Sequence, residues 1–306
     1  MKKYIILLFL PLSLLGQSID ISFASRMFNP SVINPAAAGL INQGNSGIFV
    51  EHQSKYVGLD GAPSMSNVGY NGRIFSEQLG FGLNFNNDNV GAVSKFRFAT
   101  DLSYKIQASA LYSISFGVKG GISTNDFDVT KLSVLNPSDQ SIIDQFNQNI
   151  IYDFSVGFFI YSQNFFIEAA IPLLSNENFF SVADSNSIQL QPEYIYTSAG
   201  FKLLADREFQ VIPSVAFFNG KNLEFSKEAS IMAMTPQYFF GTSYRFDSHF
   251  SIIAGLNLLD TFTIGYTYES IVSSLKPTIK NSHGIFLKLN FGALDPVNVN
   301  LVSPRF

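Results

Sequence analysis

The sequence contains no cysteine and no tryptophan, and only 14% of its residues are charged. Without cysteine, disulfide bonds and thiolate chemistry are excluded. The low charge is unusual, because a soluble domain carries about a quarter charged residues. After Leu15 no apolar run is long enough to cross a membrane as a helix, which takes about 20 residues. The chain is therefore neither an ordinary soluble domain nor a helical membrane protein.

The first residues have the features of an export signal. Lys2 and Lys3 precede an apolar run, Tyr4–Leu15, and Gly16 is a small residue before a cleavage site. We expect a signal peptide over residues 1–16, and the absence of cysteine excludes a lipoprotein anchor. Losing the two lysines leaves 17 basic against 23 acidic residues, so the net charge changes from −4 to −6. An acidic chain is not expected to bind nucleic acid.

What the chain does have is 32 Phe and 13 Tyr, which recur in alternation with polar residues. Successive side chains of a strand point to opposite faces, so such a strand has one apolar face. The alternation recurs about fourteen times, which predicts an all-β fold, a transmembrane antiparallel β-barrel over residues 46–293. It is clearest in Ser94–Ile106, where we expect these residues to face lipid: Phe96, Phe98, Leu102 and Tyr104.

The lengths of the connections favour the same topology. Long connections follow the first, third, fifth, seventh and thirteenth expected strands, and residues 87–92 form the one after the third. Outer-membrane barrels have even strand numbers, short periplasmic turns and longer outer loops. We therefore expect a bacterial outer-membrane barrel with both termini in the periplasm, in contact with membrane lipid.

Two segments lie outside the alternating pattern. Residues 17–45 contain two Asn-Pro pairs, which favour turns, and are expected to form a short non-barrel periplasmic segment. Residues 294–306 are expected to form a periplasmic tail. In the first segment, Asn34, Pro35 and Gly39 shape either an entry plug or simply a turn.

The polar faces of the strands are expected to line the lumen, with charges that neutralise one another in pairs. In the tenth expected strand Lys227 falls among the apolar residues, so either it lies near the edge of the apolar band or a bulge shifts the register. The expected lumen-facing charges are Lys95, Arg97, Asp101, Asp153, Glu168, Lys202, Arg245, Glu269 and Lys288.

Signatures of catalysis are missing. The three histidines, His52, His249 and His283, do not have metal-ligand spacing, and neither a G-x-S-x-G elbow nor a phosphate-binding loop is present. We expect no enzymatic activity and no cofactor. A hydrolase assembled from separate strands, with His283 as its base, remains an alternative.

Several motifs together resemble the PorP/SprF family of type IX secretion system membrane proteins. They are MFNPSVINPAAAG from Met27, VGLDGAP from Val57, FGTSYRFDS from Phe240, IGYTYESIVSSL from Ile264 and NSHGIFLKLNFG from Asn281. The chain departs from relatives at Lys55-Tyr56, where they carry Gln-Trp, and at Gly284, where they carry Glu. We take as partner-binding or family-motif residues Asn29, Pro30, Asn34, Pro35, Gly39, Tyr56, Gly58, Gly61, Ala62, Pro63, Tyr244, Arg245, Gly265, Tyr266 and His283. Alternatively, Gly58, Gly61 and Pro63 only shape a loop.

The resemblance implies an outer-membrane barrel that is not an enzyme and serves type IX secretion. It implies as partners secreted cargo or gliding adhesins with a type IX carboxy-terminal domain, and periplasmic components linked to peptidoglycan. The alternative function is a transport channel, either a diffusion porin or a carrier of hydrophobic ligands.

Overall fold

The structure is a computed structural model, which describes residues 21–40, 46–128, 150–172, 194–205, 209–220, 223–258, 261–272 and 281–291. In this part of the chain no helix is long and apolar enough to cross a membrane. The expected signal peptide, residues 1–16, and the expected tail, residues 294–306, lie outside the described residues.

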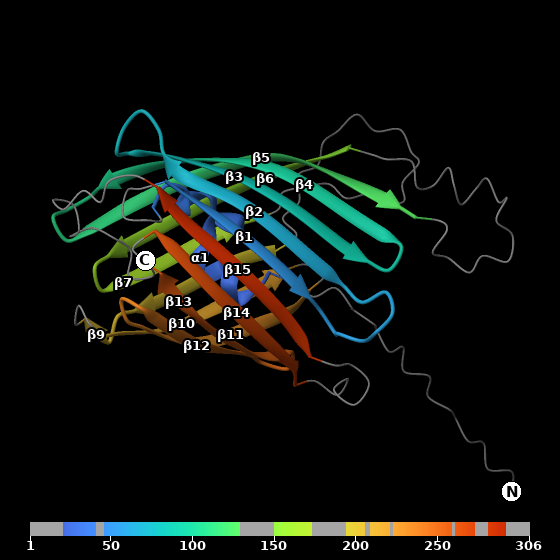
Figure 1. Cartoon of the computed structure of the whole chain (residues 1–306). Coiled ribbons are helices and arrows are strands. Elements are labelled where there is room, and N and C mark those ends of the chain that lie inside the picture. The colour runs from blue at the N-terminus through green and yellow to red at the C-terminus, as the bar shows by residue number, and fades with distance from the viewer. Residues whose placement is uncertain are drawn as a thin grey trace, which may run out of the picture.

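Antiparallel strands dominate the described chain and wrap into a barrel (Figure 1). The strands are β1 (Ser46–Ser54), β2 (Ser64–Arg73), β3 (Leu79–Val90), β4 (Val93–Gln107), β5 (Tyr112–Phe127), β6 (Ile150–Ser162), β7 (Phe165–Ile171), β8 (Tyr194–Phe201), β9 (Leu204–Ala205), β10 (Gln210–Gly220), β11 (Leu223–Met234), β12 (Tyr238–Arg245), β13 (His249–Leu258), β14 (Phe262–Ile271) and β15 (Ser282–Phe291).

The sheet closes because β1 pairs with β15, from Ser46 opposite Phe291 to Ser54 opposite His283. The strands β8 and β9 both pair with β10 on the same edge, so they form one barrel strand with a break at Lys202 and Leu203. At the break, the Lys202 amide donates to the carbonyl of Asn164 (2.7 Å). The predicted antiparallel barrel of fourteen strands is thereby confirmed.

The strand ends that flank the longer connections lie at one end of the barrel, which we call the outer mouth; these connections are residues 55–63, 128–149, 172–193 and 272–281. The opposite end, with the short turns 74–78, 108–111 and 163–164, is called the inner end. In outer-membrane barrels the longer loops face outward.

The loop expected at residues 87–92 was wrong. The strands β3 and β4 continue through it to a tight turn at Gly91 and Ala92, where Val90 pairs with Val93. Asn and Asp favour turns, but pairing with β2 on one side and β4 on the other satisfies the backbone here. The strand β5 pairs with β4 along its whole length, as far as Phe127 opposite Val93.

Side chains alternate between the outer surface and the interior. On β4, Phe96, Leu102 and Tyr104 are exposed outside, whereas Asp101 is buried inside. Phe98 is half-buried against Phe85 of β3, with 4.6 Å between ring centroids. An apolar outer surface, with the polar residues of β4 facing inward, is the arrangement typical of a membrane barrel.

Lys227 lies on the outer face near the start of β11. Its register opposite Phe217 is regular, and the shift in this hairpin lies between Phe218 and Gly220. The Lys227 ammonium is 5.2 Å from the centre of the Phe246 ring, a cation–π contact. Of the two alternatives, a place near the edge of the apolar band is therefore the one the structure supports.

The interior of the barrel holds the segment that precedes β1, drawn in blue in Figure 1. This segment, residues 21–40, is called the plug and contains α1 (Phe23–Phe28), η1 (Pro30–Val32) and η2 (Pro35–Ala37). The sequence predicted a non-barrel segment that forms either an entry plug or simply a turn, and its described part, residues 21–40, occupies the lumen. Nearly every side chain of the plug is buried, because its Phe and Ala residues pack against inward faces that would otherwise enclose a void.

Candidate functional site

The plug is one short α-helix followed by two 3-10 turns, with boundaries set by its caps and prolines. The side chain of Ser22 accepts a hydrogen bond from the amide of Ser25 (2.9 Å) and caps α1. Each proline begins a 3-10 turn, because its fixed φ suits the first helical position. Asn34 caps the second turn by accepting from the amide of Ala36 (3.0 Å). The two Asn-Pro pairs thus fold the plug into a compact shape.

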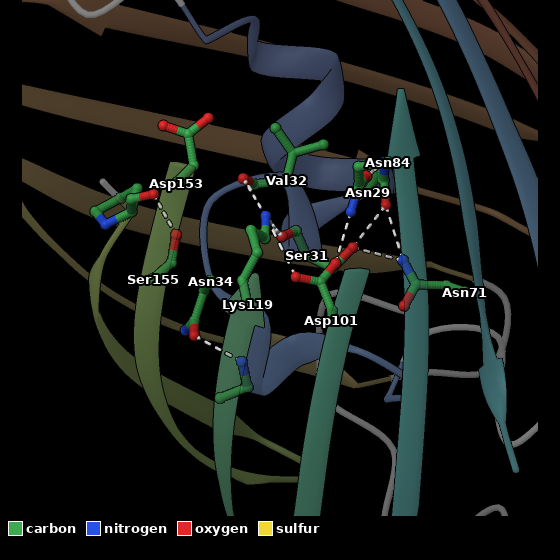
Figure 2. A network of polar contacts seen from close by, with 12 residues as sticks. Asn29, Ser31, Val32, Asn34, Asn71, Asn84, Asp101, Lys119, Asp153 and Ser155 are labelled. Atoms are coloured by element: carbon green, nitrogen blue, oxygen red, sulfur yellow. Dashed lines mark hydrogen bonds and ion pairs between the residues drawn. The ribbon is translucent and has the colours of Figure 1, made fainter. Parts of the chain in front are cut away.

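Asn29 lies at the centre of a network of buried side-chain amides (Figure 2). Its Nδ2 donates to the Oδ1 atoms of Asn84 (3.1 Å) and Asn67 (3.3 Å). Its Oδ1 accepts from Nδ2 of Asn71 (2.9 Å) and from the hydroxyl of Ser31 (3.1 Å). Because donors face acceptors throughout, the network fixes the position of the plug against β2 and β3.

The network continues into a buried ion pair between Asp101 of β4 and Lys119 of β5. Asn84 donates from Nδ2 to Asp101 (2.6 Å), and Lys119 Nζ lies 3.4 Å from the other carboxylate oxygen. The same ammonium donates to the backbone carbonyls of Ser31 (2.7 Å) and Val32 (2.8 Å). A buried charge is costly unless it is paired and hydrogen-bonded, so the plug completes the solvation of Lys119.

Asn34 holds the plug to the next strands. Its Nδ2 donates to Glu168 of β7 (3.0 Å) and to the carbonyl of Phe158 on β6 (3.2 Å). The hydroxyl of Tyr196 donates to the other oxygen of Glu168 (3.0 Å). We use the name polar wall for the inward residues that contact this part of the plug, together with Asp101, which binds two of them: Asn67, Asn71, Asn84, Asp101, Lys119 and Glu168.

Glycines on the inward faces make room for the backbone of the plug. A Cβ added at Gly117 would lie 2.2 Å from the amide nitrogen of Ala36. One added at Gly80 would lie 2.1 Å from the carbonyl oxygen of Ala38. Both distances are far below van der Waals contact, so only glycine admits the plug at these points.

The other side of the lumen is apolar. The ring of Phe28 lies between those of Phe239 (4.9 Å between centroids) and Phe286 (4.8 Å). Aromatic pairs at such separations stabilise by about 0.5–1.5 kcal/mol beyond the area that they bury. We call the inward apolar residues around α1 the apolar wall: Phe49, Ile212, Met232, Phe239, Ile253 and Phe286.

Ionic contacts hold α1 near the outer mouth. The hydroxyls of Ser22 and Ser25 donate to the two oxygens of Glu51 on β1. Arg26 pairs with Glu228 of β11, which also accepts from Nε of Arg245 (3.0 Å). One buried carboxylate thus lies between two guanidinium groups, and this restrains α1 against both β11 and β12.

Most of the charged residues that we expected to face the lumen are buried in the structure, and most of their partners differ from the expected pairs. Within the predicted set, Arg97 Nε pairs with Asp153 (2.8 Å). The other described ion pairs of this set join one of its residues to a residue outside it. Asp101 pairs with Lys119, and Glu269 pairs with Lys55 (3.6 Å). Buried inward charges are Asp101, Asp153, Glu168, Arg245, Glu269 and Lys288, while Lys95, Arg97 and Lys202 are half-buried.

The loop of residues 55–63, called the outer-mouth loop, is folded onto its neighbours. The Val57 amide donates to the carbonyl of Asn281 (3.0 Å), and the Gly91 amide donates to that of Gly61 (3.0 Å). The Tyr56 amide donates to the hydroxyl of Ser282 (3.3 Å). Tyr56, Gly58 and Gly61 all have positive φ. The family residues of this loop, through Ala62 and Pro63, therefore define a fixed shape at the mouth.

The remaining family residues lie mostly on the outer surface, away from the plug. The Tyr266 hydroxyl and Nδ1 of His283 share a hydrogen bond on adjacent strands β14 and β15. The rings of Tyr244 and Phe246 pack edge to face, with 5.0 Å between their centroids. Gly265 faces inward and makes room for the ring of Phe286. The structure thus separates the predicted residues into three places. Asn29, Pro30, Asn34, Pro35 and Gly39 lie in the plug, Tyr56 to Pro63 lie at the mouth, and the others lie on the barrel strands β12, β14 and β15.

Sequence reasoning missed the residues that meet the plug, above all Glu51, Lys119 and Glu228. Strand periodicity predicts that these side chains point inward, but it does not predict that they bind the plug. One signal was present in the sequence: Gly80, Gly117 and other glycines recur on the inward faces where large polar residues would suit an aqueous pore.

Solved structures with the same fold are outer-membrane proteins. The toluene transporter TbuX of Ralstonia pickettii is 10% identical, with a TM-score of 0.50 over 88% of this chain and 94% of that one. The monoaromatic hydrocarbon channel CymD is 11% identical, with a TM-score of 0.50 over 91% and 96%. At such identities only the fold is shared. Among curated proteins no sequence matches.

The sequence matches a known family over most of its length. The family model described as type IX secretion system membrane protein PorP/SprF matches residues 16–289. This match covers the plug, the outer-mouth loop and nearly the whole barrel. The chain therefore belongs to the PorP/SprF family of type IX secretion system membrane proteins.

Proposed function

We propose that this protein assists the secretion or surface attachment of particular cargo proteins or gliding adhesins, by binding their type IX carboxy-terminal domains. It does so as a non-enzymatic component of the outer membrane. The observation that carries the proposal is the filled lumen, because buried contacts hold the plug on all sides. A barrel filled in this way offers a partner its loops and surface rather than an open pore.

The outer-mouth loop is the binding surface that we propose for cargo. Val57 and Leu59 expose 45% and 49% of their surface at its tip, although the backbone around them is held by hydrogen bonds. Exposed apolar side chains on a fixed loop bind a partner with little loss of conformational entropy.

The inner end is the surface that we propose for periplasmic, peptidoglycan-linked components of the secretion machinery. In the turn between β2 and β3, Phe75 is 98% exposed and has a positive φ. A bulky residue held in this backbone region is strained, and such strain is often associated with function.

The test is a deletion strain complemented with the wild-type chain or with Val57→Ser plus Leu59→Ser. Mass spectrometry of the surface and secreted fractions measures every protein with a type IX carboxy-terminal domain. We expect at least one such protein to be lost on deletion and to remain absent with the loop variant. The matched control is Val90→Ser plus Val93→Ser, which removes two exposed apolar side chains (53% and 38%) from the tight turn between β3 and β4, outside the outer-mouth loop and away from the inner end. Unchanged cargo in the deletion strain would contradict the proposal.

A channel for hydrophobic ligands is the second candidate. The names of TbuX and CymD describe transport of toluene and monoaromatic hydrocarbons, and the apolar wall would suit such compounds. Purified protein in planar bilayers and liposomes distinguishes the two functions. Steady conductance would favour a porin, toluene uptake would favour the transporter, and neither is expected for an attachment barrel.

A further inference from the structure

The plug runs through the barrel from one end to the other, and its carboxy-terminal end lies at the inner end. The Gly39 carbonyl accepts from Nε of Arg73 (3.3 Å), the last residue of β2 before a short turn. The Ala38 carbonyl accepts from the hydroxyl of Ser103 (2.6 Å), close to the inner end of β4. From here the chain continues to Ser46, the first residue of β1, at the same end.

The amino-terminal end of the plug lies toward the outer mouth. Ser22 binds Glu51, three positions before β1 ends at the mouth. Ile21 packs against the cluster that contains Tyr194, the first residue of β8 after the connection 172–193. Arg26 meets Glu228 beside Arg245, the last residue of β12 before the mouth. Contacts on three separate parts of the barrel therefore agree.

From this direction we infer that the mature chain begins at the outer mouth, so that its amino terminus faces the outside of the cell. The cut expected after Gly16 leaves residues 17–20 ahead of Ile21. Four residues span at most about 14 Å when fully extended. The apolar band of such a barrel is about 25 Å tall, so these residues are too few to return to the inner end.

This inference replaces the expectation that both termini lie in the periplasm, and it goes beyond the proposed function. The plug is continuous with β1 at the inner end, whereas its amino-terminal end opens outward. An extracellular partner can then grip the plug itself, in addition to the outer-mouth loop. A pull from outside would act first on Ser22, Ser25 and Arg26, and only later on the network around Asn29.

The absence of cysteine allows a direct test, because each single-cysteine variant carries only one thiol. The variants are Ser18→Cys ahead of the plug, Asp60→Cys in the outer-mouth loop and Glu77→Cys in an inner turn; Asp60 and Glu77 are both exposed. Intact and permeabilised cells are treated with a membrane-impermeant maleimide, and labelling is measured on the purified barrel. Intact mass of the wild-type protein establishes where the mature chain begins.

We expect Ser18→Cys to react in intact cells as completely as Asp60→Cys, while Glu77→Cys reacts only after permeabilisation. Labelling of Ser18→Cys only together with Glu77→Cys would overturn the inference, since it would place this residue at the inner end. Reaction only after denaturation would also overturn it, because residue 18 would then be enclosed. The comparison with two control positions makes the result independent of any assumed orientation of the barrel.

Discussion

The two sides of the lumen hold the same plug by different physical means. The polar wall binds Asn29, Asn34 and the carbonyls of η1 through hydrogen bonds that require a particular donor opposite a particular acceptor. The apolar wall surrounds α1 with rings and aliphatic groups that have no such directional requirement. The polar wall therefore sets the position of the plug, and the apolar wall supplies burial without specifying position closely.

This difference predicts how each wall responds to substitution. A buried polar network is costly to break, because a remaining partner stays buried without its hydrogen bond. A packed apolar contact tolerates a change of shape when the volume is nearly kept. The predictions below test this contrast, beginning with the largest expected effect.

Asp101→Ala tests the ion pair of the polar wall. The change leaves Lys119 buried without its counter-ion, and breaking a buried pair in this way costs about 3–5 kcal/mol. We expect a loss of that size in the free energy of unfolding, measured by urea titration of the barrel in lipid vesicles. The double variant Asp101→Ala with Lys119→Met should recover most of the loss. A single variant as stable as the wild-type protein would show that water solvates Lys119.

Asn29→Leu removes the centre of the amide network while nearly keeping its volume. The amides of Asn67, Asn71 and Asn84 then lose a common partner, and each unsatisfied buried group costs about 1–3 kcal/mol. Because the loss falls on the plug contact, we expect the plug to leave its site more often. A reporter cysteine at the fully buried Ala37 should then react faster with maleimide.

The matched control for Asn29→Leu is Asn87→Leu, the same substitution at an exposed position of β3. It should leave the reaction rate of Ala37→Cys unchanged. Equal rates in both variants and in the wild-type background would mean that the amide network does not retain the plug.

Phe28→Leu tests the apolar wall and should have a smaller effect. A hydrophobic exchange of similar volume costs less than about 1.5 kcal/mol, whereas Phe28→Ala would leave a cavity and cost about 3–5 kcal/mol. Urea titration of the two variants measures the difference. If Phe28→Leu destabilised the barrel as much as Phe28→Ala, the apolar wall would need the same exact fit as the polar wall.

The sequence predicted the barrel because strand periodicity is a local property. On β4 the alternation of Phe96, Leu102 and Tyr104 with Asp101 and Ser103 needs no knowledge of any other segment. Pairing of each strand with the next then follows from short connections, and closure follows from the need to leave no edge in lipid. The loop expected at residues 87–92 failed because cross-strand pairing outweighed local turn preference.

The plug could not be predicted in the same way, because its place depends on contacts between residues far apart in the chain. Asn29 and Asn34 read locally as turn formers, and only the positions of Asn84 and Glu168 across the lumen make them anchors. The inward glycines indicated that something approaches these strands closely. They did not indicate which segment it is.

The smallest effect is expected on the outer surface, where the family residue Tyr266 contacts neither wall. Tyr266→Phe removes the hydrogen bond with His283 at an exposed site, where a typical bond contributes about 1 kcal/mol or less. Stability in urea and the reaction of Ala37→Cys should both remain close to those of the wild-type protein. If cargo display nevertheless falls in the strain that carries this variant, the loss must arise from a partner contact, because fold and plug are unchanged. If cargo display is also unchanged, the Tyr266 hydroxyl makes no partner contact, and Tyr266 belongs to the lipid-facing surface.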